Sequence, residues 1–178
     1  MKRAKVCILG EVSVGKTSLV RRFVDRAFSD DYLSTVGVKI SRKLVHITDP
    51  GSDREDELQL ILWDLEGGHT WLEVSSTYLK GASGAIIVGD LTRPSTLREI
   101  QGYIDRFKEI NPDGNIVVAL NKIDVQRDRH AGTVDEHFEG ATLLATIHTS
   151  ARTGKGVDEL FMTLGAHLLR NTGNGPHA

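Results

Sequence analysis

The sequence predicts an α/β fold: a mostly parallel six-stranded sheet with one antiparallel edge strand and helices on both faces. Three observations indicate this class. Short runs that are apolar throughout recur along the chain, as in strands buried on both sides. Stretches with helical spacing of apolar residues separate most of these runs. Two strands are instead joined by a turn, which makes them a hairpin.

The elements follow one another in this order. The six expected strands cover residues 5–9, 36–47, 58–63, 85–90, 115–120 and, more weakly, 145–149. The second and third strands flank a turn at 49–53, which contains Pro and Gly. Helices are expected over residues 15–23, 95–110 and 157–169, and Asn111-Pro112 stops the second of them.

Length and composition exclude several classes of protein. A chain of 178 residues, 39% hydrophobic and 26% charged, is expected to form one domain, here 1–170, before a polar tail, 171–178, expected to be disordered. A net charge of −2 argues against a nucleic-acid binder that depends on bulk positive charge. The single cysteine, Cys7, excludes an intramolecular disulfide framework and fits a reducing, cytoplasmic compartment.

The segment after the first strand carries the most specific motif. Residues 10–17 read G-x-x-x-x-G-K-[ST], with Gly10, Gly15, Lys16 and Thr17 at the fixed positions. The glycines let the backbone curl so that its N–H groups point at phosphate oxygens. The lysine places positive charge on the outer phosphates, and the threonine offers a hydroxyl to Mg²⁺. A strand before and a helix after the motif provide the context that a phosphate-binding loop requires.

A second motif follows strand 58–63. Asp64 and Gly67 form D-x-x-G, which is weak by itself but stands directly after a strand. A carboxylate at this position holds Mg²⁺ through water, and a glycine N–H contacts a terminal phosphate.

Two further motifs follow strands 115–120 and 145–149. Asp124, in Asn-Lys-Ile-Asp, suits the N–H and NH₂ groups on one edge of guanine, whereas adenine leaves this carboxylate unpaired. The backbone N–H of Ala151, in Thr-Ser-Ala-Arg, meets the guanine carbonyl. Either motif alone is also compatible with a polar turn. Four motifs in order at successive strand ends favour a nucleotide site.

With these motifs, the chain resembles small GTPases of the Ras superfamily, and the Rab-like branch most, over about residues 4–170. The resemblance implies a P-loop NTPase G domain. It implies metal ligation by Thr17, Thr35 and Asp64, stacking of Phe28 on the base, and catalytic roles for Lys16, Thr35 and Gly67. The implied nucleotide-binding residues are Gly10, Ser13, Val14, Gly15, Lys16, Thr17, Ser18, Phe28, Tyr32, Thr35, Asp64, Gly67, Asn121, Lys122, Asp124, Ser150, Ala151 and Arg152.

The resemblance also implies a mechanism and partners. GTP and Mg²⁺ hold two loops, about 29–38 and 64–78, and hydrolysis of GTP to GDP and phosphate releases them. An effector, an exchange factor and an activating protein are expected to read these loops. A cytoplasmic monomer that binds no nucleic acid is the corresponding expectation.

Three features depart from the family pattern. The glutamine that orients the attacking water is replaced by Gly68, and Val12 occupies a phosphate-loop position that is often small. Both predict slow unassisted hydrolysis. His69 either accepts a proton from that water or is an exposed loop residue, and a partner is a third source of the missing group. The chain ends without cysteine, so no prenyl anchor is expected; it is either truncated or resembles prokaryotic members.

Two other functions remain open beside the weak GTPase. One is a GTP-binding scaffold with negligible hydrolysis, which Gly68 and Val12 favour. The other is a P-loop kinase acting on a small metabolite. A kinase needs an arginine-bearing lid, and no inserted segment in the sequence provides one.

Overall fold

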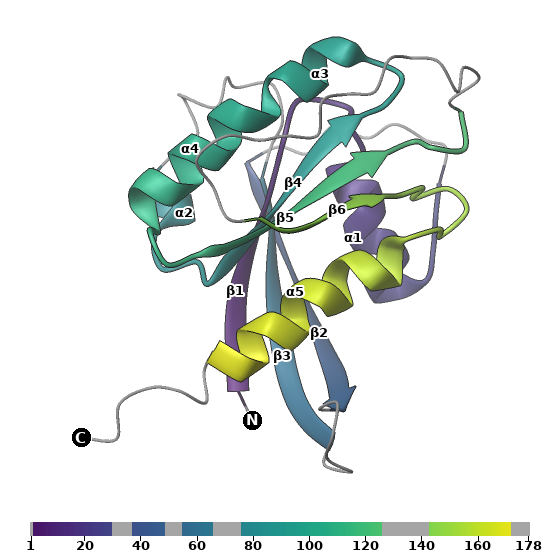
Figure 1. Ribbon diagram of the computed structural model, residues 1–178. Helices are drawn as coiled ribbons and strands as arrows, with labels where there is room; N and C mark the ends of the chain where they lie inside the picture. Colours follow the sequence, from purple (N-terminus) through teal and green to yellow (C-terminus); the bar gives the residue numbers. More distant parts are fainter. Residues whose placement is uncertain (1, 30–36, 49–54, 66–75, 126–142, 172–178) are drawn as a thin grey trace.

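The computed structural model describes residues 2–29, 37–48, 55–65, 76–125 and 143–171, and it confirms the predicted α/β architecture (Figure 1). The strands are β1 (Lys2–Leu9), β2 (Val38–Thr48), β3 (Glu55–Leu65), β4 (Gly84–Asp90), β5 (Asn115–Asn121) and β6 (Leu143–His148). The helices are α1 (Lys16–Asp25), α2 (Ser76–Leu79), α3 (Pro94–Arg98), α4 (Ile100–Ile110) and α5 (Val157–Asn171).

The six strands form one sheet in the order β2-β3-β1-β4-β5-β6. Only β2 and β3 pair in the antiparallel direction, so the predicted antiparallel edge strand is β2. The other neighbouring strands run parallel. The carboxyl ends of β1, β3, β4 and β5 therefore lie along one edge of the sheet, where ligands of such folds bind.

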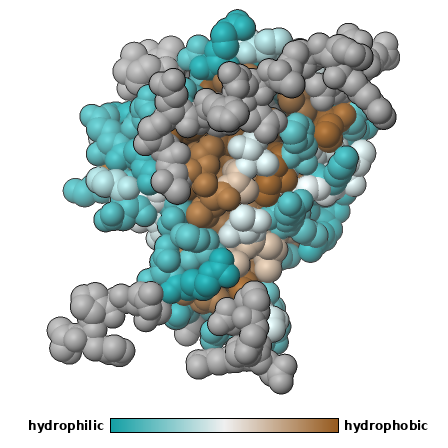
Figure 2. All heavy atoms as spheres, in the orientation of Figure 1, coloured by the Kyte–Doolittle hydropathy of each residue, from teal (hydrophilic) through white to brown (hydrophobic). Residues whose placement is uncertain are grey.

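Helices cover both faces of the sheet. The core under α1 and α5 includes a stacked pair, Phe23 and Phe161, with ring centroids 4.2 Å apart. The other core lies under α4 and contains Ile104 and Phe107. Every residue of β4 is buried, as expected for a central parallel strand. Figure 2 shows apolar residues gathered between α4 and α5, around the edge strand β6, which is less fully covered.

The structure differs from the sequence prediction in one helix that is divided, one short helix that was not predicted, and the ends of several elements. The single helix expected over 95–110 is two helices, α3 and α4, with Glu99 between them at φ −79° and ψ −14°. Those angles approach 3₁₀ geometry, so the chain keeps its helical sense while the α-helical hydrogen bonding is interrupted. The short helix α2 was not predicted, and β3 extends from Glu55 to Leu65, beyond its predicted ends. In the described part of the chain, no helix is long and apolar enough to cross a bilayer.

Candidate nucleotide-binding site

The phosphate loop connects β1 to α1 and needs glycine at both of its predicted glycine positions. Gly10 has φ 139° and Gly15 has φ 102°, values that residues with a side chain rarely adopt. A Cβ on Gly10 would lie 2.3 Å from the backbone oxygen of Val88, and one on Gly15 would lie 2.2 Å from Nδ2 of Asn121. The loop therefore passes too close to β4 and β5 for any side chain at these two positions.

The carbonyl oxygens along this loop all accept hydrogen bonds. The acceptor and donor pairs are Gly10 and Glu11 with Lys16 Nζ (both 2.7 Å), Val12 with Arg93 Nη2 (2.6 Å), Ser13 with Lys122 Nζ (2.8 Å), Val14 with Asn121 Nδ2 (2.9 Å) and Gly15 with Leu19 N (2.9 Å). In a trans peptide the N–H points away from the C=O. Fixing the carbonyls thus turns the loop amides to the opposite side, where they make an anion-binding concavity.

Lys16 and the start of α1 add positive charge to this concavity. The lysine is 7% exposed, and burial lowers its pKa to about 8, although the nearby Asp64 and Glu11 carboxylates act in the other direction. No side chain caps the N-terminus of α1, whose N-cap is Gly15. The helix dipole and its first amides are therefore directed to the same place as the loop amides. Ser18 lies in this first turn.

Thr17 and Asp64 form the polar part of the site that suits a metal ion. Asp64 is the second-last residue of β3 and lies beside Ile8 of β1. It is 1% exposed, and its Oδ2 accepts a hydrogen bond from the Thr17 hydroxyl. Its buried Oδ1 accepts no hydrogen bond from any described residue. Burial raises the pKa of this carboxyl, and the Thr17 bond and Lys16 only partly oppose the rise. A buried oxygen without a donor beside a hydroxyl fits Mg²⁺, which prefers such oxygen ligands.

Asn121 connects the phosphate loop to the segment expected to hold the base. This residue closes β5 and is 1% exposed. Its Nδ2 donates to Val14 O, while its Oδ1 accepts from Thr149 Oγ1 at 3.1 Å and from Ala151 N at 3.3 Å. One N–H of its amide and its amide oxygen are thus used within the protein, so Asn121 holds two loops together.

The residues predicted to recognise guanine come together beyond Asn121. Ser150 Oγ donates to Asp124 Oδ1 at 2.6 Å, which orients the exposed carboxylate. Ser150 itself is fully buried, and Ala151 is 5% exposed. Lys122 adopts a left-handed φ of 69° that turns its side chain toward the phosphate loop. The side chain of Arg152 is exposed, and its backbone oxygen accepts a hydrogen bond from Arg22 Nη2.

The predicted stacking residue Phe28 lies near the same loop, and an arginine that the sequence reasoning missed connects them. Arg22 donates from Nε to Ala151 O at 2.8 Å and from Nη2 to Arg152 O. Its guanidinium lies 5.7 Å from the centroid of the Phe28 ring. Phe28 is half-buried and packs against the core under α1. Nothing in the local sequence around Arg22 pointed to a loop so distant along the chain.

Other supporting residues were also missed. Tyr103 of α4 donates its hydroxyl to Glu11 Oε1 at 2.9 Å, and burial and that carboxylate raise the tyrosine pKa. Asp90, the last residue of β4, contacts Lys122 and Arg93, and Arg93 in turn contacts the tip of the phosphate loop at Val12. The only sequence signal for Asp90 and Arg93 was that the apolar run of β4 ends abruptly in a charged residue, Asp90.

Three predicted site residues, Tyr32, Thr35 and Gly67, lie outside the described residues, as do Gly68 and His69. Their proposed roles stay predictions. Within the described ranges, no group of three or more His, Cys, Asp or Glu side chains is arranged to hold a metal. The Thr17 and Asp64 pair is thus the part of a metal site that the described chain provides.

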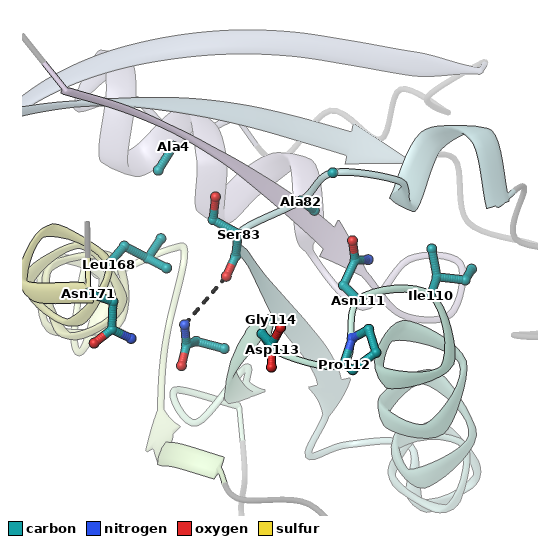
Figure 3. Close-up of a pocket in the computed structure, with 12 residues that line it drawn as sticks. Ala4, Ala82, Ser83, Ile110, Asn111, Pro112, Asp113, Gly114, Leu168 and Asn171 are labelled. Atoms are coloured by element: carbon teal, nitrogen blue, oxygen red, sulfur yellow. Dashed lines mark hydrogen bonds between the residues drawn. The ribbon is translucent and has the colours of Figure 1, made fainter. Parts of the chain in front are cut away.

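A surface pocket lies at the opposite end of the sheet (Figure 3). Its lining includes Ala4, Ser83, Asn111, Asn115 and Leu168, at the amino ends of three strands and the end of α5. Asn115 Nδ2 is 3.5 Å from Ser83 O, so these polar groups pair with each other. No residue of the predicted nucleotide site lines this pocket, and it adds nothing to the site.

Known proteins match nearly the whole chain. The profile of the Ras family matches residues 5–170. Ras-related protein Rab-21 of Homo sapiens is 30% identical over 182 residues, which cover 96% of this chain and 77% of that protein. Rab-21 of the sponge Geodia cydonium is 34% identical over 170 residues, covering 94% and 71%. Rab-32A of Dictyostelium discoideum is 30% identical over 176 residues, covering 94% and 78%.

Proposed function

Because the chain belongs to the Ras family, we propose that it is a guanine-nucleotide switch that binds GTP and GDP with Mg²⁺ and hydrolyses GTP to GDP and phosphate. The observation that carries this proposal is the phosphate loop. All of its carbonyls from Gly10 to Gly15 are held by donors, and it lies beside the Thr17 and Asp64 pair. The proposal treats residues 1–170 as one G domain.

In this proposal each residue of the site has a definite task. The loop amides and the start of α1 bind the phosphates, and Lys16 places its ammonium on the outer ones. Thr17, Asp64 and the predicted ligand Thr35 would hold Mg²⁺, which would compensate the negative charge of the phosphate oxygens. Gly67 donates its backbone N–H to the terminal phosphate.

The base is proposed to be guanine. The Asp124 carboxylate accepts from the N–H and NH₂ groups of one guanine edge, and Ala151 N–H meets the carbonyl beside them. Ser150 fixes the carboxylate in its orientation. Adenine would place an acceptor opposite Asp124 and leave its carboxylate, which the bound base would cover, without a donor; this costs about 1–3 kcal/mol or more.

Hydrolysis without an activator is proposed to be slow. Gly68 carries no side chain to orient the attacking water. Val12 is 37% exposed at the tip of the phosphate loop, where its branched side chain occupies room that water or an activator's residue would use. The same two residues favour the second candidate, a GTP-holding module with negligible hydrolysis.

Partners are proposed to bind through residues 29–38 and 64–78. The described surface at and beside these ranges exposes large apolar side chains: Ile40 is 45% exposed and Tyr78 is 37% exposed. Trp63 pairs with Ile40 across β2 and β3, and Lys5 Nζ lies 4.0 Å from its ring centroid. Such a surface suits an effector, an exchange factor or an activating protein. We place the monomeric protein in the cytoplasm, where the single buried thiol of Cys7 would stay reduced.

Single-turnover hydrolysis tests the proposal. Protein loaded with GTP in excess Mg²⁺ is followed for hours by the appearance of GDP, beside Lys16→Ala. Conversion above that control supports the switch, and GTP retained without conversion supports the GTP-holding module. Competition between GTP and ATP is measured on the same preparation. Failure to retain any guanine nucleotide, or equal retention of ATP, would overturn the proposal.

A further inference from the structure

The carboxylate of Asp90 is the most heavily bonded acidic group near the site. Asp90 closes β4 and is 0% exposed. Its Oδ1 accepts from the backbone N of Thr92 at 2.9 Å and from the Thr92 hydroxyl at 2.6 Å. Its Oδ2 accepts from Arg93 Nε at 2.9 Å and from Lys122 Nζ at 2.8 Å. Burial alone would raise its pKa, but these donors lower it, so Asp90 is a fixed negative charge.

The two cations held by Asp90 each reach the phosphate loop. Arg93 Nη2 donates to Val12 O at 2.6 Å, and Lys122 Nζ donates to Ser13 O at 2.8 Å. One buried oxygen therefore supports two adjacent peptide groups of the loop through two cations. Lys122 belongs to a motif with a predicted role, whereas Arg93 has no assigned role.

The loop needs such support at this point. Ser13 has a left-handed φ of 61°, which costs a residue with a side chain about 1–2 kcal/mol. A conformation of this kind persists where the surrounding structure fixes it. Val12, next to it, is 37% exposed, so little packing holds that peptide from outside. The Arg93 guanidinium supplies the contact that packing does not.

We propose that Arg93 is a positioning residue for the phosphate end of the nucleotide: anchored on Asp90, it holds the Val12 peptide and keeps the loop amides aimed at the phosphates. The inference rests on the proposed function. The side-chain hydrogen bonds of Arg93 in the described structure go to Asp90 and Val12 and not to the residues proposed to bind the base, so its removal is expected to act at the phosphate end of the nucleotide.

Dissociation of GDP measures this role. Fluorescent GDP is loaded with Mg²⁺ and chased with unlabelled GDP in wild type, Arg93→Ala and Arg98→Ala. Removing a charge-assisted bond to the loop is expected to speed release about tenfold. Arg98 is the matched control, since it is an exposed arginine on the same short helix. Its removal is expected to change the rate less than twofold.

Two further readouts separate positioning from a general loss of structure. Lysine at position 93 reaches Asp90 or Val12 O but not both, so Arg93→Lys is expected to release GDP at an intermediate rate. Inosine diphosphate lacks the guanine amino group, and the ratio of its release rate to that of GDP reports base recognition. This ratio should be unchanged in Arg93→Ala and should fall toward one in Asp124→Asn.

The outcomes separate this inference from the function on which it rests. A wild-type protein that does not retain GDP overturns the proposed function. A wild type that retains it, with Arg93→Ala as slow as Arg98→Ala, overturns the role of Arg93 alone. The role of Arg93 is also overturned if Arg93→Ala changes the ratio of the inosine diphosphate release rate to the GDP release rate. It is overturned as well if Arg93→Ala unfolds even with GDP while Arg93→Lys releases GDP at the wild-type rate.

Discussion

Replacing Asn121 by aspartate tests the connection between the phosphate loop and the base segment. The change keeps the volume and the oxygen that accepts from Thr149 and Ala151. It replaces the Nδ2 donor, 2.9 Å from Val14 O, by an acceptor. Two oxygens would then face each other in a place where Asn121 is 1% exposed and Val14 is fully buried.

The magnitude follows from the free energy needed to protonate the introduced carboxylate at a given pH. A buried carboxylate facing a carbonyl can take up a proton and donate it, so the charge penalty cannot exceed the cost of protonation. From an ordinary pKa of about 3.9, that cost is about 4 kcal/mol at pH 7 and about 1.5 kcal/mol at pH 5. The pKa of the introduced carboxyl is higher in the folded protein than in the unfolded chain. The loss of unfolding free energy is therefore greatest above the folded-state pKa and shrinks as pH falls toward 3.9. Asn121→Asp should therefore regain about 2.5 kcal/mol between pH 7 and pH 5.

Urea unfolding of the GDP-saturated protein at pH 5, 6 and 7 measures this penalty, as the difference in unfolding free energy from wild type. The matched control is Asn115→Asp at the other end of β5, where the amide is half-buried and 3.5 Å from Ser83 O. That carboxylate stays hydrated, so its penalty should be below about 1 kcal/mol and nearly independent of pH. Equal penalties at the two positions, or no pH dependence for Asn121→Asp, would refute the reasoning.

Three further predictions concern the phosphates and the metal. Gly10→Ala should lower the free energy of unfolding in urea by about 2–6 kcal/mol, since its Cβ would lie 2.3 Å from Val88 O. The control Gly81→Ala, whose Cβ would have nothing within 4 Å, should lower it by about 1–2 kcal/mol. With a pKa of about 8, the Lys16 side chain is mostly charged at pH 7 and mostly neutral at pH 9. The nucleotide-free protein should therefore bind fluorescent GDP up to about tenfold more weakly at pH 9 than at pH 7. An unchanged affinity would contradict this prediction. Asp64→Asn keeps an acceptor for the Thr17 hydroxyl but loses the charge, so chelating Mg²⁺ should accelerate GDP release in wild type and have little effect in the variant.

Much of the fold and part of the site could be predicted from the sequence, because those features depend on local patterns. The loop at 10–17 has fixed spacing, and two of the apolar strands are followed closely by predicted site residues, Asp64 and Asp124. The alternation of strands and helices indicated a mostly parallel sheet, whereas the order of its strands comes from the structure. These patterns need only neighbouring residues to be recognised.

The supporting contacts could not be predicted, since they join distant parts of the chain. Arg93 reaches Val12 across 81 positions, and Arg22 reaches Ala151 across 129. Neither arginine carries a local signal that distinguishes it from any surface arginine. The break between α3 and α4 was missed for a related reason, since Glu99 fits a helix by composition and only its backbone angles show the interruption.

The carboxyl end of β5 has a consequence for how the nucleotide leaves. Asn121 and Lys122 are consecutive, and they hold consecutive carbonyls of the phosphate loop, those of Val14 and Ser13. Asn121 also bonds to Ala151 in the base segment. In the proposed function, the binding energies of guanosine and of the phosphates would therefore not be additive, because each half would bind a site that the other half has already ordered. A protein that displaces either half would loosen the other, and we expect release of the whole nucleotide to be cooperative.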